Sequence, residues 1–71
     1  MDLDLARTFL EIVRYGSLAS AADKLHVTQT AVTARVQKLE SLLGVTLFVR
    51  NRAGARLTPD GEAFVVYANQ L

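Results

Sequence analysis

The sequence has no cysteine and only one histidine among its 71 residues. Disulfides and thiolate metal sites are therefore excluded, and one imidazole argues against a histidine metal cluster. No run approaches the roughly eighteen uninterrupted apolar residues of a membrane span. The opening stretch "MDLDLARTF" carries acids where a secretory signal carries lysines, so we expect a cytoplasmic protein that does not associate with membranes.

The net charge is small, but the basic residues are unevenly distributed along the chain. The net charge is only +1, which alone would not suggest a nucleic-acid partner. Residues 1–34 sum to −1, however, whereas residues 35–56 hold five basic side chains against a single glutamate and sum to +4. Concentrated basic charge of this kind is typical of an anion-binding face.

Hydrophobic periodicity and capping residues predict three helices in the first 44 residues, which are enough for one small core. The expected ranges are 3–15, 18–25 and 28–43, with Asp2 or Asp4, Ser17 and Thr28 as N-caps. Gly16 and Gly44 are expected to end the first and third helices. The apolar side chains that set the three stripes are Leu5, Phe9, Ile12 and Val13; Leu18, Ala21, Ala22 and Leu25; and Val32, Val36, Leu39 and Leu43.

A hairpin and a fourth helix are predicted after residue 44. The short β-type runs "VTLFVR" and "ARLT" are separated by "NRAG", which has asparagine and glycine for a tight turn. Thr58 as cap and Pro59 at the first helical position then start a helix that shows no stop signal before Leu71. We therefore interpret the chain as part of a longer protein.

The second and third predicted helices have the pattern of a helix-turn-helix. This motif requires a small residue where the helices cross, a turn residue that tolerates positive φ, and apolar anchors after the turn. Ala22, His26, Val27 and Val32 occupy these positions. Histidine replaces the usual glycine in the turn, but it is among the non-glycine residues that adopt left-handed conformations more often.

The side of the third helix that faces away from its apolar stripe is short, polar and almost uncharged, unlike an ordinary solvated surface. A helix in the major groove of DNA needs such a slim, hydrogen-bonding face. Gln29 could pair with adenine, and Thr30 and Thr33 could contact bases or a thymine methyl. Arg35 and Lys38 would lie toward phosphates, with a guanine as the alternative partner of Arg35. The candidate DNA-binding residues of this helix are Thr28, Gln29, Thr30, Thr33, Ala34, Arg35, Gln37 and Lys38.

The hairpin supplies a second candidate contact. Arg50, Arg52 and Arg56 surround the "NRAG" turn and suit phosphates or a narrow minor groove. For Arg50, an ion pair with Glu40 or Asp60 that secures the hairpin is an equal alternative.

The fourth helix is the candidate dimerisation element. Val65 and Val66 add apolar area beyond the single stripe that packing on one neighbour requires. The alternative is that this face packs on the first helix of the same chain. The candidate dimerisation residues are Phe64, Val65, Tyr67, Ala68 and Leu71.

The stretch "FLEIVRYGSLASAADKLHVTQTAVTARVQKLESLLGVTLFVRNRAGARLTPDGE" carries the patterns "AA..L..TQ.AV...V..LE..LGV.LF.R" and "R.LT..G". On these motifs the chain resembles the amino-terminal domain of LysR-type transcriptional regulators. It departs from the family pattern at Thr30, where serine or proline is usual, at Thr33, where serine is usual, and at Asp60, where alanine is common. The two threonines keep or add a hydroxyl, so their main effect would be on the choice of bases.

The resemblance implies a mainly α fold with a small β-hairpin: a winged helix-turn-helix with a three-helix core, a two-stranded wing and the start of a linker helix. The DNA-binding domain would span residues 1–58 and the linker or dimerisation helix would begin at 59–71. It further implies binding to double-stranded DNA of dyad symmetry as a homodimer, with a tetramer in the full-length protein. No cofactor is expected in this part; a small-molecule co-inducer would bind a separate carboxy-terminal domain.

Two other classes of function were weighed against DNA binding. A winged helix can serve as a protein-protein interaction module, since fold does not fix function, but such a helix should present large apolar anchors outward. An enzyme has less support, because His26 lies in a turn and no nucleophile-base arrangement has a supporting context. Asp2 and Asp4 are more simply helix caps than a catalytic pair.

Overall fold

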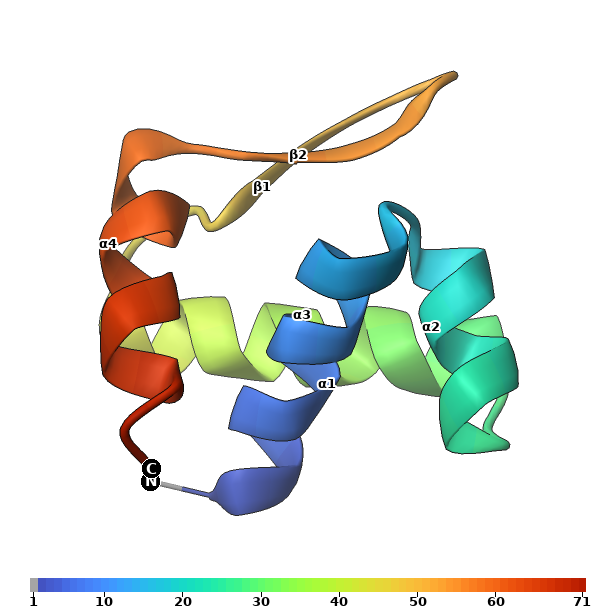
Figure 1. The fold of residues 1–71 in the computed structure, drawn as a ribbon, viewed down its shortest axis with the longest axis horizontal. Coiled ribbons are helices and arrows are strands. Elements are labelled where there is room, and N and C mark those ends of the chain that lie inside the picture. Colours follow the sequence, from blue (N-terminus) through green and yellow to red (C-terminus); the bar gives the residue numbers. More distant parts are fainter. Residues whose placement is uncertain (1) are drawn as a thin grey trace.

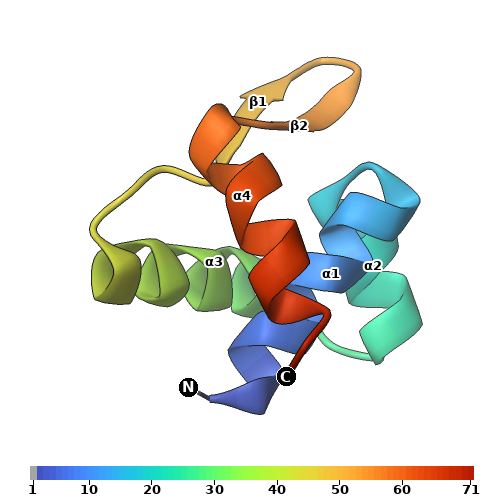
Figure 2. The same ribbon diagram turned by 60° about the vertical axis from the view of Figure 1, so that its left-hand side comes forward.

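The computed structural model describes residues 2–71, which form four helices and a two-stranded antiparallel hairpin. The elements follow in the order α1 (Leu3–Tyr15), α2 (Leu18–Leu25), α3 (Gln29–Leu43), β1 (Phe48–Asn51), β2 (Gly54–Leu57) and α4 (Pro59–Ala68). Figures 1 and 2 show the hairpin on the side of the molecule where α1 meets α2, while the start of α1 and the end of α4 lie at the opposite side. The mainly α architecture with a small hairpin is as predicted.

Side-chain caps start each helix. The side-chain oxygens of Asp2, Ser17, Thr28 and Thr58 accept hydrogen bonds from backbone N–H groups two or three residues further on, at 2.9 to 3.1 Å. Each bond satisfies a donor that the first turn of a helix leaves without a partner. The predicted caps are confirmed, and of the two aspartates considered for α1 it is Asp2 that caps.

The turn between α2 and α3 has the geometry that a helix-turn-helix requires. His26 adopts the left-handed conformation with φ 57° and ψ 42°, and within residues 2–71 it is the only non-glycine residue with positive φ. Its N–H donates to the carbonyl of Asp23 at 3.3 Å, and the N–H of Val27 donates to that of Ala22 at 3.1 Å. The turn therefore forms without glycine, as expected.

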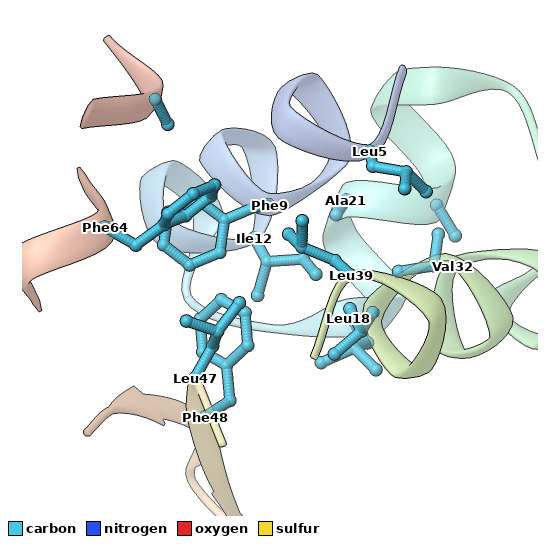
Figure 3. Packing of buried hydrophobic residues seen from close by; sticks show 13 residues of the cluster. Leu5, Phe9, Ile12, Leu18, Ala21, Val32, Leu39, Leu47, Phe48 and Phe64 are labelled. Carbon is cyan, nitrogen blue, oxygen red and sulfur yellow. The ribbon is translucent and has the colours of Figure 1, made fainter. Parts of the chain in front are cut away.

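One hydrophobic core joins all four helices and the hairpin. Phe9 is fully buried, and its ring centroid lies 5.3 Å from that of Phe48 and 5.0 Å from that of Phe64. Figure 3 shows these rings beside Ile12 and Leu39, which come from α1 and α3. Because the three aromatic rings belong to α1, β1 and α4, they tie both the wing and the last helix to the helical core.

The first strand starts later than the sequence suggested. The predicted run began at Val45, whereas β1 begins at Phe48. Leu47 explains the difference: its N–H donates to Glu40 Oε2 at 2.6 Å and its carbonyl accepts from the N–H of Thr58 at 3.0 Å. Since these bonds hold Leu47 between α3 and the start of α4, pairing with β2 begins only one residue later, where Phe48 faces Leu57.

Helix α4 is shorter than predicted. It ends at Ala68 and not at Leu71, because the last residues close i to i+3 turns: the N–H of Gln70 donates to Tyr67 and that of Leu71 donates to Ala68, at 3.0 and 3.2 Å. Among residues 2–71, no helix has the length and apolar character needed to cross a membrane.

Candidate nucleic-acid interface

The outer ridge of α3 is formed by four exposed residues, which are Thr30, Ala34, Gln37 and Ser41. Val32, Val36 and Leu39, at most 4% exposed, set the inward direction of the helix. With 3.6 residues per turn, the ridge residues point roughly opposite to this stripe. Thr30, Gln37 and Ser41 end in neutral groups that donate and accept hydrogen bonds. Ala34 carries only a methyl group. The slim polar face expected from the sequence is therefore an accessible surface.

The flanks of α3 differ from one another. Gln29 is exposed in the first turn, beside the wing, and Thr33 is half-buried on the same side. On the other flank Lys38 is exposed, but the guanidinium of Arg35 donates from Nη1 to Thr8 Oγ1 at 3.2 Å.

This contact directs Arg35 toward α1, so its placement differs from the DNA-facing role that the sequence suggested. Thr8 is buried and its hydroxyl donates to the carbonyl of Asp4 at 2.7 Å. The hydroxyl thus links α1 to the guanidinium, and Arg35 joins two helices within the domain.

The wing and the start of α3 meet in an open groove of about 200 Å³. Arg50 and Arg52 line one side, and Gln29 and the start of α2 line the other. The complete lining is Ser17, Leu18, Ala19, Gln29, Arg50, Asn51, Arg52 and Gly54. The guanidinium groups of Arg50 and Arg52, the hydroxyl of Ser17 and the amide of Gln29 therefore converge, although they lie up to 35 residues apart in sequence.

The three wing arginines do not share one face. Side chains alternate between the two faces of a strand, and the register pairs Arg50 with Ala55 and Arg56 with Val49. Arg56 is exposed on the face opposite to Arg50 and is absent from the groove lining. Glu40, one partner considered for Arg50, accepts instead from the backbone of Leu47.

The wing is fixed to the helical core at its tip. The N–H of Ala55 donates to the carbonyl of Gly16, at the turn between α1 and α2, at 3.0 Å. Gly54 has φ 134°, and a Cβ there would collide with that carbonyl oxygen. Asn51 Oδ1 accepts from the N–H of Ala53 at 2.9 Å and closes the turn around Arg52. The position of Arg52 is thus set by a glycine contact that periodicity cannot reveal.

The candidate dimerisation residues differ in their exposure. Phe64 and Ala68 are 6% and 3% exposed and pack in the core of the same chain, so the prediction that they face a second chain is corrected in favour of the alternative, packing on α1. Val65 is half-buried against the core. Tyr67 and Leu71 remain 50% and 48% exposed.

Sequence reasoning missed two features of these surfaces. Ser17 was interpreted only as a cap, yet it lines the groove beside the wing arginines. Leu3, 63% exposed, lies with Leu10 and Leu71 along an apolar groove between α1 and the end of α4. The one signal in the sequence for the groove between α1 and α4 is that Leu3 lies outside the buried stripe of α1.

A helix-turn-helix with an exposed polar ridge on its second helix, flanked by an arginine-bearing hairpin, is a winged helix-turn-helix domain. The family model described as "Bacterial regulatory helix-turn-helix protein, lysR family" matches residues 3–62. The chain belongs to this family, which consists of transcription regulators and is not a catalytic family.

Curated relatives agree with this assignment. The HTH-type transcriptional regulators HdfR of Yersinia pestis (strain Pestoides F) and of Yersinia pseudotuberculosis serotype O:1b (strain IP 31758) are 48% identical to the chain over all of its 71 residues. The chain spans 24% of the length of each, so it corresponds to about a quarter of these regulators.

Solved structures agree as well. The crystal structure of a complex of the CbnR DNA-binding domain with DNA matches with a TM-score of 0.94 at 37% identity, covering 99% of this chain and 80% of that one. A complex of the BenM DNA-binding domain with the catB site 1 DNA matches with a TM-score of 0.92 at 36% identity, covering 99% and 79%. At 36–37% identity the chain shares sequence as well as fold with these two DNA-binding domains.

Proposed function

We propose that this chain is the part of a LysR-type transcriptional regulator that recognises specific sequences in double-stranded DNA, with α3 in the major groove. The observation that carries the proposal is the exposed ridge of α3, which is slim, uncharged and able to hydrogen-bond, next to a groove that holds two arginines. The major groove of B-DNA is wide enough for a helix and displays a distinct donor and acceptor pattern for each base pair.

The wing would hold the DNA backbone. Arg50 and Arg52 lie beside the first turn of α3. The sugar-phosphate backbone of DNA would pass there if Gln29 contacted the bases. Arg56, on the other face of the wing, and Lys38, on the far flank of α3, would add phosphate contacts. The DNA complexes of the CbnR and BenM domains support the assignment by analogy.

Fluorescence anisotropy with a duplex selected from a random library tests the proposal. Gln29→Ala should weaken binding to the selected duplex by about 1–3 kcal/mol and leave binding to random DNA nearly unchanged. Gln70→Ala, at the opposite end of the chain, is the matched control. Equal losses on both duplexes would show that Gln29 does not contact bases, and failure to select any preferred duplex would refute the proposal.

The salt dependence of binding tests the wing. Arg52→Gln should reduce affinity for all sequences and make the slope of log K against log salt shallower by about one unit, because one fewer phosphate is neutralised. Arg52→Lys keeps the charge and should keep the slope. An unchanged slope in Arg52→Gln would remove Arg52 from the phosphate contacts.

We also propose a homodimer through α4, which would place two copies of α3 on a dyad-symmetric operator. Val66 and Tyr67 on α4 and Leu71, three residues after its end, are 64%, 50% and 48% exposed, and a group of exposed apolar side chains favours association. Val66→Glu should shift sedimentation equilibrium toward monomer. Leu42→Glu also replaces an apolar side chain by a carboxylate, at a similarly exposed position on α3, 62%, and should leave the equilibrium unchanged. A wild-type chain that stays monomeric at high concentration would contradict this dimer.

The remaining properties concern the whole regulator. On the family assignment, we propose a cytoplasmic regulator in which residues 59–71 begin a linker helix after the DNA-binding domain of residues 1–58. A carboxy-terminal domain would bind a small-molecule co-inducer, and dimers would assemble into a tetramer. The alternative function, a protein-protein interaction module, would require large apolar anchors on α3, and among its outward residues only Leu42 is such a side chain.

A further inference from the structure

We infer that the close contact between Gly61 and the backbone of Leu47 sets the spacing of the two half-sites that a dimer of this chain binds. The inference rests on the proposed function and on the proposed dimer through α4. It assigns a positioning role to a residue that is buried and does not itself face DNA. The role follows from the direction in which α4 leaves the domain, which is fixed at two places along the helix.

The first attachment of α4 is a close approach in its first turn. A Cβ added to Gly61 would lie 2.2 Å from the carbonyl oxygen of Leu47, whereas ordinary van der Waals contacts of a Cβ lie between 3.4 and 4 Å. Only glycine therefore lets the helix lie this close to the segment before β1. Because the nearest atom belongs to the backbone, no side chain can rotate away to make room for a larger residue.

Hydrogen bonds hold the same place. The carbonyl of Leu47 accepts from the N–H of Thr58 at 3.0 Å. The hydroxyl of Thr58 donates to the carbonyl of Thr46 at 2.5 Å and accepts from the N–H of Gly61 at 2.9 Å. The N–H of Leu47 in turn donates to Glu40 on α3 at 2.6 Å. The start of α4 is thereby joined, through one short segment, to the end of α3.

The second attachment of α4 lies further along the helix. Phe64 and Ala68 are buried in the core, and the ring of Phe64 lies 5.0 Å from that of Phe9 on α1. Figure 2 shows α4 running from the base of the hairpin toward the start of α1. Two separate attachments fix the direction of a rigid helix. In a symmetric dimer through α4, that direction also fixes the distance between the two copies of α3.

The displacement that Gly61→Ala requires is comparable with the rise of a base pair. The first turn of α4 has to move by about 1 Å to lengthen the contact from 2.2 Å to an ordinary 3.4 Å. With Ala68 held in the core about 10 Å further along the helix, α4 tilts by about 7°. Across a domain 24 Å long, such a tilt moves α3 by up to about 3 Å in each copy, whereas adjacent base pairs are about 3.4 Å apart. The two copies together would shift the spacing by about one or two base pairs.

A series of duplexes measures the spacing directly. Each duplex carries two inverted copies of the half-site selected from the random library, and the spacer between them changes by one base pair at a time. In fluorescence anisotropy we expect the wild type to bind one spacing best, and Gly61→Ala to bind best at a spacing changed by about one or two base pairs. On a duplex with a single half-site the two proteins should bind equally, because the outer ridge of α3 is unchanged. A purely structural role of Gly61 would lower both kinds of binding together.

Two more variants complete the test. Asp60→Glu also adds one carbon to the first turn of α4, but at an exposed position, and should keep the spacing of the wild type. Thr58→Val removes the hydroxyl bonds to Thr46 and Gly61 with little change of shape. It should reduce the ratio of affinities between the best spacing and its neighbours while binding to the single half-site is retained. Thr58→Val decides the question if circular dichroism shows that Gly61→Ala does not fold.

The outcomes separate this inference from the proposals on which it rests. A folded Gly61→Ala that keeps the spacing of the wild type, or an unfolded one together with an unaltered ratio in Thr58→Val, overturns the inference and leaves DNA recognition and the dimer standing. A wild type that binds every spacing equally also overturns it. A wild type that stays monomeric removes the dimer and the inference together, whereas failure to select any preferred duplex refutes the proposed function itself.

Discussion

Replacement of Gly54 by alanine should detach the wing from the helical core. Gly54 has φ 134°, a conformation that L-residues rarely adopt, and an added Cβ would collide with the carbonyl oxygen of Gly16. That oxygen accepts the hydrogen bond from the N–H of Ala55 that fixes the hairpin at 3.0 Å. Because the obstacle is backbone and not a flexible side chain, the hairpin itself has to move.

The size of the effect follows from two contributions. A backbone conformation this unfavourable for alanine costs about 1–3 kcal/mol, and loss of the hydrogen bond costs about 1 kcal/mol more. The sum of about 2–4 kcal/mol is a large part of the stability of a domain of this size, which at about 0.05–0.15 kcal/mol per residue is roughly 4–11 kcal/mol.

Urea denaturation followed by circular dichroism, with amide hydrogen exchange at Ala55, measures both consequences. Gly44→Ala is the matched control: Gly44 also has positive φ, 72°, but a Cβ there meets nothing within 4 Å. We expect Gly54→Ala to be the more destabilising by at least 1 kcal/mol, roughly the hydrogen bond alone, and to lose protection at Ala55. Equal destabilisation with protection retained would refute the close approach of wing and turn.

Three further changes test the core of the domain by the same denaturation assay. Glu40→Ala should destabilise by about 1–3 kcal/mol, because it leaves the buried N–H of Leu47 without an acceptor; no change would mean that water replaces the carboxylate. Thr28→Ala should cost about 1 kcal/mol as the loss of the α3 cap, whereas Thr30→Ala, at an exposed position, should cost less. His26→Gly should stabilise the domain slightly, since relief of about 1–2 kcal/mol of left-handed strain exceeds the added entropy of the unfolded chain; a destabilised variant would contradict that balance.

The helices were predictable from the sequence because their signals are local. Caps such as Ser17 and Thr28 lie within three residues of the donors they satisfy, and the stripe of Val32 and Val36 repeats at helical spacing. The left-handed turn at His26 could be assigned because its neighbours already fit a helix-turn-helix. A pattern confined to a few residues specifies its own structure.

The parts that could not be predicted depend on contacts between distant residues. The start of β1 is set by Leu47, which bonds both to Glu40 and to Thr58, and nothing in the run from Val45 to Arg50 records this. Likewise, the apolar stripe of α4 looked equally suited to a second chain or to this one. The ring of Phe64 packs against Phe9, 55 residues earlier, so only the tertiary structure decides.

Arginine at position 35 shows how the same limit affects a binding surface. Charge distribution places Arg35 in the basic third of the chain, and a guanidinium on a groove-binding helix would ordinarily be assigned to DNA. The fold instead joins it to Thr8, whose hydroxyl is buried and already donates to Asp4. Withdrawal of this cation leaves Lys38 as the only exposed basic residue of α3, so the charge beside the ridge depends on a contact behind the surface as much as on the residues that face outward.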